Sequence, residues 1–223
     1  MKPAIGSRQS AIGGLAVLAL AVLAAPLHAQ LEQHATFSLG GGNTRLTAVT
    51  GAGTARLSGI TIGGSARFDR GRWSVEGGYR QGSLAPDSGA VTTQDLAEAR
   101  LMLAVRPVPW LSVLAGPHAL AFITPSGTER WLLFEARARA AGTVVSPAVS
   151  TYVELWAALG GSVNVGTGSP SARGGEVGIT LLIPRSPVWA RLAYGMERAT
   201  QSGSANIRTV EDIRVSIGIW KGQ

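Results

Sequence analysis

Residues 97–105 read AEARLMLAV, and this short stretch decides the fold. Its odd-numbered residues are all apolar, whereas Glu98 and Arg100 lie between them. Side chains alternate between the two faces of a β-strand, so the pattern puts apolar residues on one face and charges on the other. A helix would mix the two sets. The stretch therefore predicts a strand with one apolar and one polar face.

The same period of two recurs along the chain. In residues 131–141 the even-numbered positions are Leu, Phe and Ala, and in the last segment Ile213, Val215, Ile217 and Ile219 share a face. We expect ten strands, near residues 33–41, 56–68, 73–84, 93–105, 110–122, 130–142, 148–163, 174–183, 188–198 and 207–220. Residues 44–50 also alternate, so they can extend the first strand or form another. Eight or twelve strands therefore stay open.

Turn-forming residues separate these segments, and the pattern predicts strict alternation of short and long connections. Short turns are expected at residues 69–72, 106–109, 145–147 and 184–187, and long loops at 42–55, 85–92, 124–129, 164–173 and 199–206. Bacterial outer-membrane barrels have short periplasmic turns, longer external loops and an even number of strands. We therefore expect an all-β fold, a closed antiparallel up-and-down transmembrane barrel.

Charges of both signs occupy the polar faces. Arginine on the lipid face costs roughly 2–4 kcal/mol at the membrane midplane, whereas opposite charges inside a barrel can pair across strands. We therefore expect the apolar face to contact lipid and the charges to line a narrow lumen with no wide channel. The expected lumen network is Glu76, Arg80, Glu98, Arg100, Glu135, Arg137, Arg139, Glu154, Glu176, Arg191, Glu197 and Arg214.

Four tryptophans lie at strand ends beside the expected short turns or the carboxyl terminus: Trp73, Trp110, Trp189 and Trp220. Amphipathic rings suit the headgroup level of a membrane, so these residues are predicted to form an interfacial aromatic girdle. The alternative is that they cap the core of a soluble protein.

The first 29 residues have the pattern of a secretory signal. Lys2 and Arg8 precede an apolar run at residues 11–25, and Leu27-His28-Ala29 offers a cleavage site. We expect a signal peptide at residues 1–29 and one domain at 30–223; an uncleaved anchor is the alternative. No later apolar run reaches the 18 residues that a transmembrane helix needs.

Composition excludes several classes of site. The chain has no cysteine, so neither disulfides nor thiolate metal sites are available. The formal net charge is +7, but the arginines are spread singly rather than clustered, which argues against a nucleic-acid partner. With few histidines and dispersed carboxylates, we expect no metal and no cofactor.

As an architecture, the chain after residue 29 resembles the small bacterial outer-membrane β-barrels, such as the transmembrane domain of outer-membrane protein A. The resemblance implies Sec-type export, outer-membrane localisation, contacts with outer-membrane lipids and lipopolysaccharide, and recognition by the assembly machinery. That family commonly ends in an aromatic residue within the alternating last strand. Here Trp220 is out of phase with the isoleucines and Lys221 follows it.

We expect the barrel to be a monomer.

The expected function is a non-enzymatic barrel with a structural or narrow-pore, porin-like role and no catalytic residue. Some barrels of this architecture act on lipid A or peptides at the external rim, so the first alternative is a rim enzyme with His118 as base near Asp87 and Asp95. The lipid A deacylases of this shape have a serine two residues after the histidine, where this chain has Leu120. We expect His118 instead to bond within the lumen network. A second alternative is a soluble periplasmic barrel that carries an apolar ligand.

Overall fold

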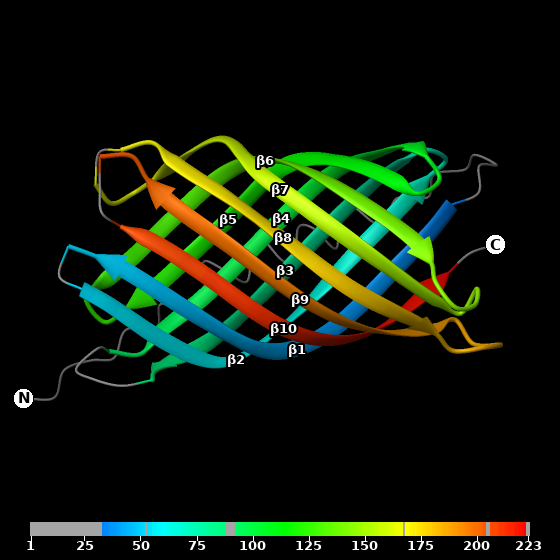
Figure 1. Cartoon of the computed structure of the whole chain (residues 1–223), viewed down its shortest axis with the longest axis horizontal. Helices are drawn as coiled ribbons and strands as arrows, with labels where there is room; N and C mark the ends of the chain where they lie inside the picture. The colour runs from blue at the N-terminus through cyan, green and yellow to red at the C-terminus, as the bar shows by residue number, and fades with distance from the viewer. Residues whose placement is uncertain (1–32, 52, 88–91, 167, 204–205, 222–223) are drawn as a thin grey trace, which may run out of the picture. The chain divides into compact units, whose positions relative to one another are not determined.

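Ten antiparallel strands close into one up-and-down barrel (Figure 1). The computed structural model describes residues 33–51, 53–87, 92–166, 168–203 and 206–221, so the predicted signal peptide lies outside the described residues. None of the described residues belongs to a helix long and apolar enough to cross a membrane. The strands are β1 Gln33–Thr50, β2 Gly53–Arg70, β3 Trp73–Pro86, β4 Gln94–Val108, β5 Leu111–Thr124, β6 Gly127–Thr143, β7 Val149–Val163, β8 Pro170–Leu182, β9 Val188–Gln201 and β10 Ile207–Lys221.

Each strand pairs with its neighbour in the chain, and β1 closes the barrel against β10. Across this seam Ala35 lies opposite Lys221 and Val49 lies opposite Ile207. Closure gives both backbone edges of every strand a partner, which a sheet needs where water is absent. The predicted all-β fold class and the count of ten strands are confirmed.

The barrel has two distinct ends. The "loop end" carries the connections β1–β2, β3–β4, β5–β6, β7–β8 and β9–β10, and the "terminus end" carries the start of β1, the end of β10 and the other four connections. At the terminus end, β2 and β3 are joined by a tight turn in which Gly71 has φ 61°. A left-handed conformation of this kind favours glycine because it has no Cβ.

The predicted loop at residues 42–55 is wrong, because β1 continues to Thr50 and β2 begins at Gly53. The alternation at Thr44, Leu46 and Ala48 continues the strand, and all three side chains are buried inside the barrel. The extension of the first strand, one of the options left open by the sequence, is the observed one.

Strict alternation of short and long connections is also wrong. Strands β5 and β6 are separated only by residues 125–126 at the loop end, where a long loop at 124–129 is predicted. At the terminus end, residues 144–148 and 183–187 form longer connections. Gly, Ser and Thr in residues 124–129 suggest a loop, but hydrogen bonding to β5 holds Gly127 and Thr128 in the ladder.

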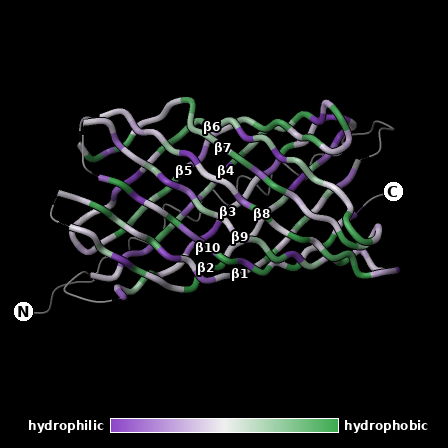
Figure 2. Tube along the Cα trace, in the orientation of Figure 1, coloured by the Kyte–Doolittle hydropathy of each residue, from purple (hydrophilic) through white to green (hydrophobic). Residues whose placement is uncertain are grey.

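The two faces of the wall differ in the way the alternation predicts. Outward-facing aliphatic side chains are widely exposed, for example Leu39 at 76% and Ile217 at 60%, whereas inward-facing Glu135 and Arg137 are almost fully buried. Figure 2 shows hydrophilic and hydrophobic positions alternating along the strands. The outer surface of the barrel is therefore apolar and its interior is ionic.

An apolar cluster fills the lumen at the loop end. We call this cluster the plug; its buried members come from every strand except β7, on which Ala158 and Val163 pack against it. Burying these large side chains removes apolar surface from the solvent and leaves little open space at this level of the lumen. The plug consists of Leu46, Leu57, Leu84, Leu96, Leu120, Phe122, Trp131, Leu133, Ala172, Ala199 and Val210.

The plug predicts a large effect of truncating a side chain from the extended first hairpin. Leu46→Ala should lower the free energy of unfolding by about 2–5 kcal/mol, because Leu46 is fully buried and its removal leaves a cavity. Leu39→Ala on the outer face of the same strand is the matched control. Urea unfolding in detergent micelles, followed by tryptophan fluorescence, measures both; equal losses would show that Leu46 is not part of a packed core.

Candidate functional site: the charged lumen

The middle of the lumen is filled by ion pairs, which we call the belt. All of the predicted network residues lie at inward-facing positions of the strands, in phase with buried neighbours such as Leu96 on β4 and Leu133 on β6. Several belt contacts join strands that are not neighbours in the sheet. Arg139 on β6 places Nη1 2.8 Å and Nη2 2.9 Å from the two carboxylate oxygens of Glu76 on β3. Side chains therefore bridge the lumen from wall to wall.

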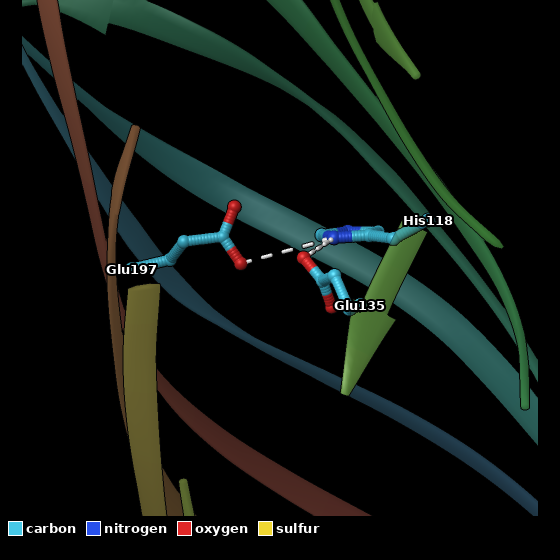
Figure 3. A group of neighbouring side chains, drawn as sticks. All are labelled: His118, Glu135 and Glu197. Carbon is cyan, nitrogen blue, oxygen red and sulfur yellow. Dashed lines mark hydrogen bonds and ion pairs between the residues drawn. The ribbon is translucent and has the colours of Figure 1, made fainter. Parts of the chain in front are cut away.

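His118 is the centre of the belt. Its side chain is 1% exposed, and its Nδ1 lies 2.7 Å from Oε1 of Glu135. Its Nε2 lies 3.3 Å from Glu98, and Glu197 lies 3.8 Å from Nδ1. The three carboxylates come from β4, β6 and β9, and Figure 3 shows the side chains of Glu135 and Glu197 converging on the ring. The imidazole is thus held among acidic groups from three different strands.

One series of ion pairs runs from His118 towards the terminus end. Arg137 joins Glu135 and Glu154 at 2.6 and 2.9 Å, and it also lies 4.5 Å from the ring centre of Trp156. Arg139 then joins Glu154 to Glu76. Each guanidinium contacts two carboxylates, an arrangement in which the planar donor groups of arginine satisfy both partners.

A second series runs from His118 around the other side of the lumen. Arg80 joins Glu98 and Asp212, and Arg214 joins Asp212 and Glu176. The phenol of Tyr152 donates a hydrogen bond to Glu176, and the indole of Trp156 donates one to Glu197 at 2.8 Å. Buried charges need such partners, because an isolated ion inside a protein is strongly unfavourable.

Sequence reasoning missed several members of this system. Asp212 lies between Arg80 and Arg214, and at the terminus end Arg67 contacts Asp69 and Glu76. Their signal was present in the sequence, because Asp212 is in phase with Arg214. At the loop end, Arg208 pairs with Glu129 across the lumen.

Two predicted network residues lack a carboxylate partner among the described residues. Arg191 donates to the hydroxyl of Thr180 at 3.0 Å and stacks on Tyr152 and Trp189, with ring centres 5.0 and 4.8 Å away. Arg100 has no ion pair to any described side chain, although it faces the same region of the lumen. Beside the belt, the lumen therefore holds two positive groups, Arg100 and Arg191, that no acidic side chain among the described residues contacts directly.

The predicted aromatic girdle needs one correction. Trp73, Trp110 and Trp220 are 56%, 58% and 43% exposed at the terminus end, but Trp189 is 5% exposed. Trp189 faces inward, stacks on Arg191 and packs against Gly218 of β10. Its position at a strand end suggested an interface, yet its phase is that of Arg191, which points into the lumen. Trp189 is therefore an interior residue.

His118, Glu135 and Glu197 are the described residues that could together hold a metal ion, since one ligand atom from each lies within 4.8 Å of the others. This group cannot be recognised in the sequence, because its members are far apart in the chain. In the structure the ring already hydrogen-bonds to Glu135, and Arg137 contacts the second oxygen of that carboxylate. The same contacts suit a histidine within an ion-pair network.

The geometry also bears on the alternative of a rim enzyme. Asp95 pairs with Ile123 on β5, five residues along the strand from His118, which corresponds to about 17 Å. Asp87 accepts a hydrogen bond from Ser58 beyond the plug. His118 is thus brought together with lumen glutamates rather than with these two aspartates.

The closed sheet, its apolar exterior and its ionic interior together define the class: the chain has the fold of the bacterial outer-membrane β-barrels. By structure it is similar to the outer membrane protease OmpT of Escherichia coli, with a TM-score of 0.51, 10% identity and coverage of 89% of this chain and 99% of that chain. An outer-membrane channel of Pseudomonas putida F1 has a TM-score of 0.45 at 11% identity, covering 88% and 97% of the two chains. Neisserial surface protein A has a TM-score of 0.38 at 12% identity, covering 82% and 96%. At this identity the likeness to OmpT concerns the fold alone. No protein-family model and no curated protein matches the chain by sequence.

The belt predicts a strong dependence of stability on Arg137. Arg137→Ala should lower the free energy of unfolding by about 3–5 kcal/mol, because Glu135 and Glu154 would lose their shared buried cation. Arg130→Ala, on the exposed outer side of the same strand, should change stability by less than about 0.5 kcal/mol. Denaturant unfolding of the two variants compares them; similar values would contradict a role for Arg137 in holding the belt together.

Proposed function

We propose that this chain is an outer-membrane barrel with a closed lumen and a structural, non-enzymatic role. The observation that carries the proposal is the combination of an apolar outer wall with charges that pair across the interior. The exposed aliphatic residues, such as Leu101 at 53% and Leu155 at 61%, would be unfavourable in water over so large a surface. Hydrocarbon removes this cost, and closure leaves no open strand edge in it.

On this proposal the aliphatic wall contacts outer-membrane lipids and lipopolysaccharide, and Trp73 and Trp110 lie at the periplasmic interface, whereas Trp220 has the inward phase of Arg214 at the end of β10. The signal-like residues 1–29 direct Sec-type export, and the outer-membrane assembly machinery inserts the barrel as a monomer. A soluble carrier of apolar ligands would need the reverse arrangement of faces, with charges outside and aliphatic side chains inside. The alternating burial of β4 and β6 argues against that alternative.

Heat-modifiable migration tests the membrane barrel. Membrane fractions of expressing cells, run on a gel with and without boiling, should give two different mobilities, because a closed barrel resists detergent until it is heated. Recovery in the outer-membrane fraction is the companion measurement. The same mobility in both samples, with the protein in the soluble fraction, would overturn the proposal.

The plug favours a closed barrel over a narrow pore, the second candidate. A pore is supported by one observation: below the plug the lumen holds a cavity of about 100 Å³ whose lining includes arginine and glutamate side chains. For such a pore to conduct, the plug would have to move aside. Trp131 and Leu133 belong to the plug and are only about 1% exposed, so they are packed too closely to leave an open path.

Conductance separates the two candidates. The purified barrel in a planar bilayer should show no steady single-channel steps, and Trp131→Ala, which removes a large plug side chain, should introduce leak or brief openings. The control is Leu132→Ala, which changes the neighbouring outward-facing residue and should leave the bilayer silent. Steady steps from the unmodified protein would establish the narrow pore instead.

The absence of enzymatic activity is part of the proposal. Lipid A from cells that express His118→Ala should have the same mass spectrum as lipid A from cells that express the unmodified protein. The buried position of His118 supports this expectation, since an external substrate would have to pass the plug. A shift in lipid A mass that disappears in the variant would support the rim enzyme.

A further inference from the structure

We propose that the lumen binds one small oxyanion, a carboxylate or a phosphate, in the cavity below the plug, where Arg100 and Arg191 would hold it. This cavity measures about 100 Å³, and its lining includes Arg80, Arg100, Arg191 and Arg214. A cavity that holds a single ordered water needs only about 10–15 Å³ of volume, so this cavity has room for a group of four or five heavy atoms.

The charges of the lining are unequal. Glu98 and Glu176 are the acidic residues that line the cavity, and they are already paired with Arg80 and Arg214 respectively. Arg100 and Arg191 contribute two further guanidinium groups that contact no carboxylate of the described chain. A negative ligand would give both guanidinium groups a direct charged contact, and charge-assisted hydrogen bonds from arginine to an oxyanion are among the stronger polar contacts in proteins.

Hydroxyl groups and missing side chains shape the rest of the wall. Ser38 and Ser65 lie opposite each other on β1 and β2, with their hydroxyls hydrogen-bonded at 2.7 Å. Ser216, on the neighbouring strand β10, also lines the cavity. Next to them Gly63 allows β3 to approach closely, because a Cβ there would collide with the backbone oxygen of Tyr79 and the side chain of Arg80. Hydroxyls can donate to an anion without adding negative charge.

Solvent reaches the cavity, and the lumen is closed above it at the loop end. Ser65 points inward, yet it is exposed, which means that solvent reaches this part of the lumen. The plug closes the loop end above it. Because the loop end is closed, a ligand would enter and leave by the terminus end, which on the function proposed above faces the periplasm. We call this space the vestibule.

Isothermal titration calorimetry tests the inference on the full barrel, refolded in detergent micelles in a buffer of low ionic strength. Inorganic phosphate and acetate are the two probes, because the separate titrations distinguish a phosphate source from a carboxylate source. We expect one saturable site per barrel for at least one of them. Arg100→Gln and Arg191→Gln should each weaken that binding about tenfold, since each removes a charged donor.

Two further variants guard the interpretation. Arg106→Gln removes a charge outside the lining, from a side chain that is 42% exposed beside Asp69, and it should change affinity less than about twofold. Ser65→Phe keeps every charge but fills the mouth of the cavity and should abolish binding, which keeps the test open if an arginine variant does not fold. Heat-modifiable migration reports folding of each variant.

Two results would overturn the inference: no saturable heat from either anion, or a loss of affinity in Arg106→Gln equal to that in the two cavity variants. The titration is made in detergent, so its failure leaves the outer-membrane proposal untouched. Conversely, if membrane fractions from cells showed the same mobility with and without boiling, the outer-membrane proposal would fail, but anion binding measured on the refolded barrel would still hold.

Discussion

A charge enclosed by a closed barrel needs an opposite charge that reaches it inside the lumen, and this constraint governs the rest of the structure. Inside the lumen Arg137 and Arg139 each contact two carboxylates, and Glu154 is a partner of both. Arg139 also contacts Glu76 on β3, a strand that is not its neighbour in the sheet, and such a contact needs a long side chain. The barrel is therefore filled at mid-height by arginine and glutamate, and its width matches the reach of those residues.

Two different kinds of packing divide the interior along its length. Aliphatic and aromatic side chains seal the loop end, whereas ion pairs occupy the middle. The filling is also uneven around the circumference. Strands β3, β4, β6 and β7 contribute large belt residues, while β1 and β2 contribute small ones such as Gly40, Gly63 and Ser65, and this difference leaves the vestibule on one side. The lumen is thus filled by long charged side chains on one side and left partly open beside the small residues of β1 and β2.

Much of this arrangement could be predicted from residue alternation. Period two in β4, β6 and β10 defined the strands, the closed fold class and the outward position of Ile213 and Ile217, because side-chain direction follows directly from position in a strand. Local composition was a poorer guide: Gly42 and Asn43 suggested a loop, but pairing with β10 and β2 on either side keeps them in β1. The contacts within the belt could not be predicted at all. Which arginine meets which glutamate depends on register across strands as distant in sequence as β3 and β10, and alternation carries no information about register between strands.

The seam between the first and last strands has a consequence for how the chain folds. Leu46 lies directly opposite Val210 across it and opposite Leu57 on its other side, so its burial is complete only when the last strand has joined the first. Bringing together segments so far apart in the chain has a large entropic cost, which local hairpins cannot offset in advance. Sealing of the interior therefore requires that the seam between β1 and β10 is paired. A barrel in which this seam is unpaired is an open sheet with an unsatisfied backbone edge at each side.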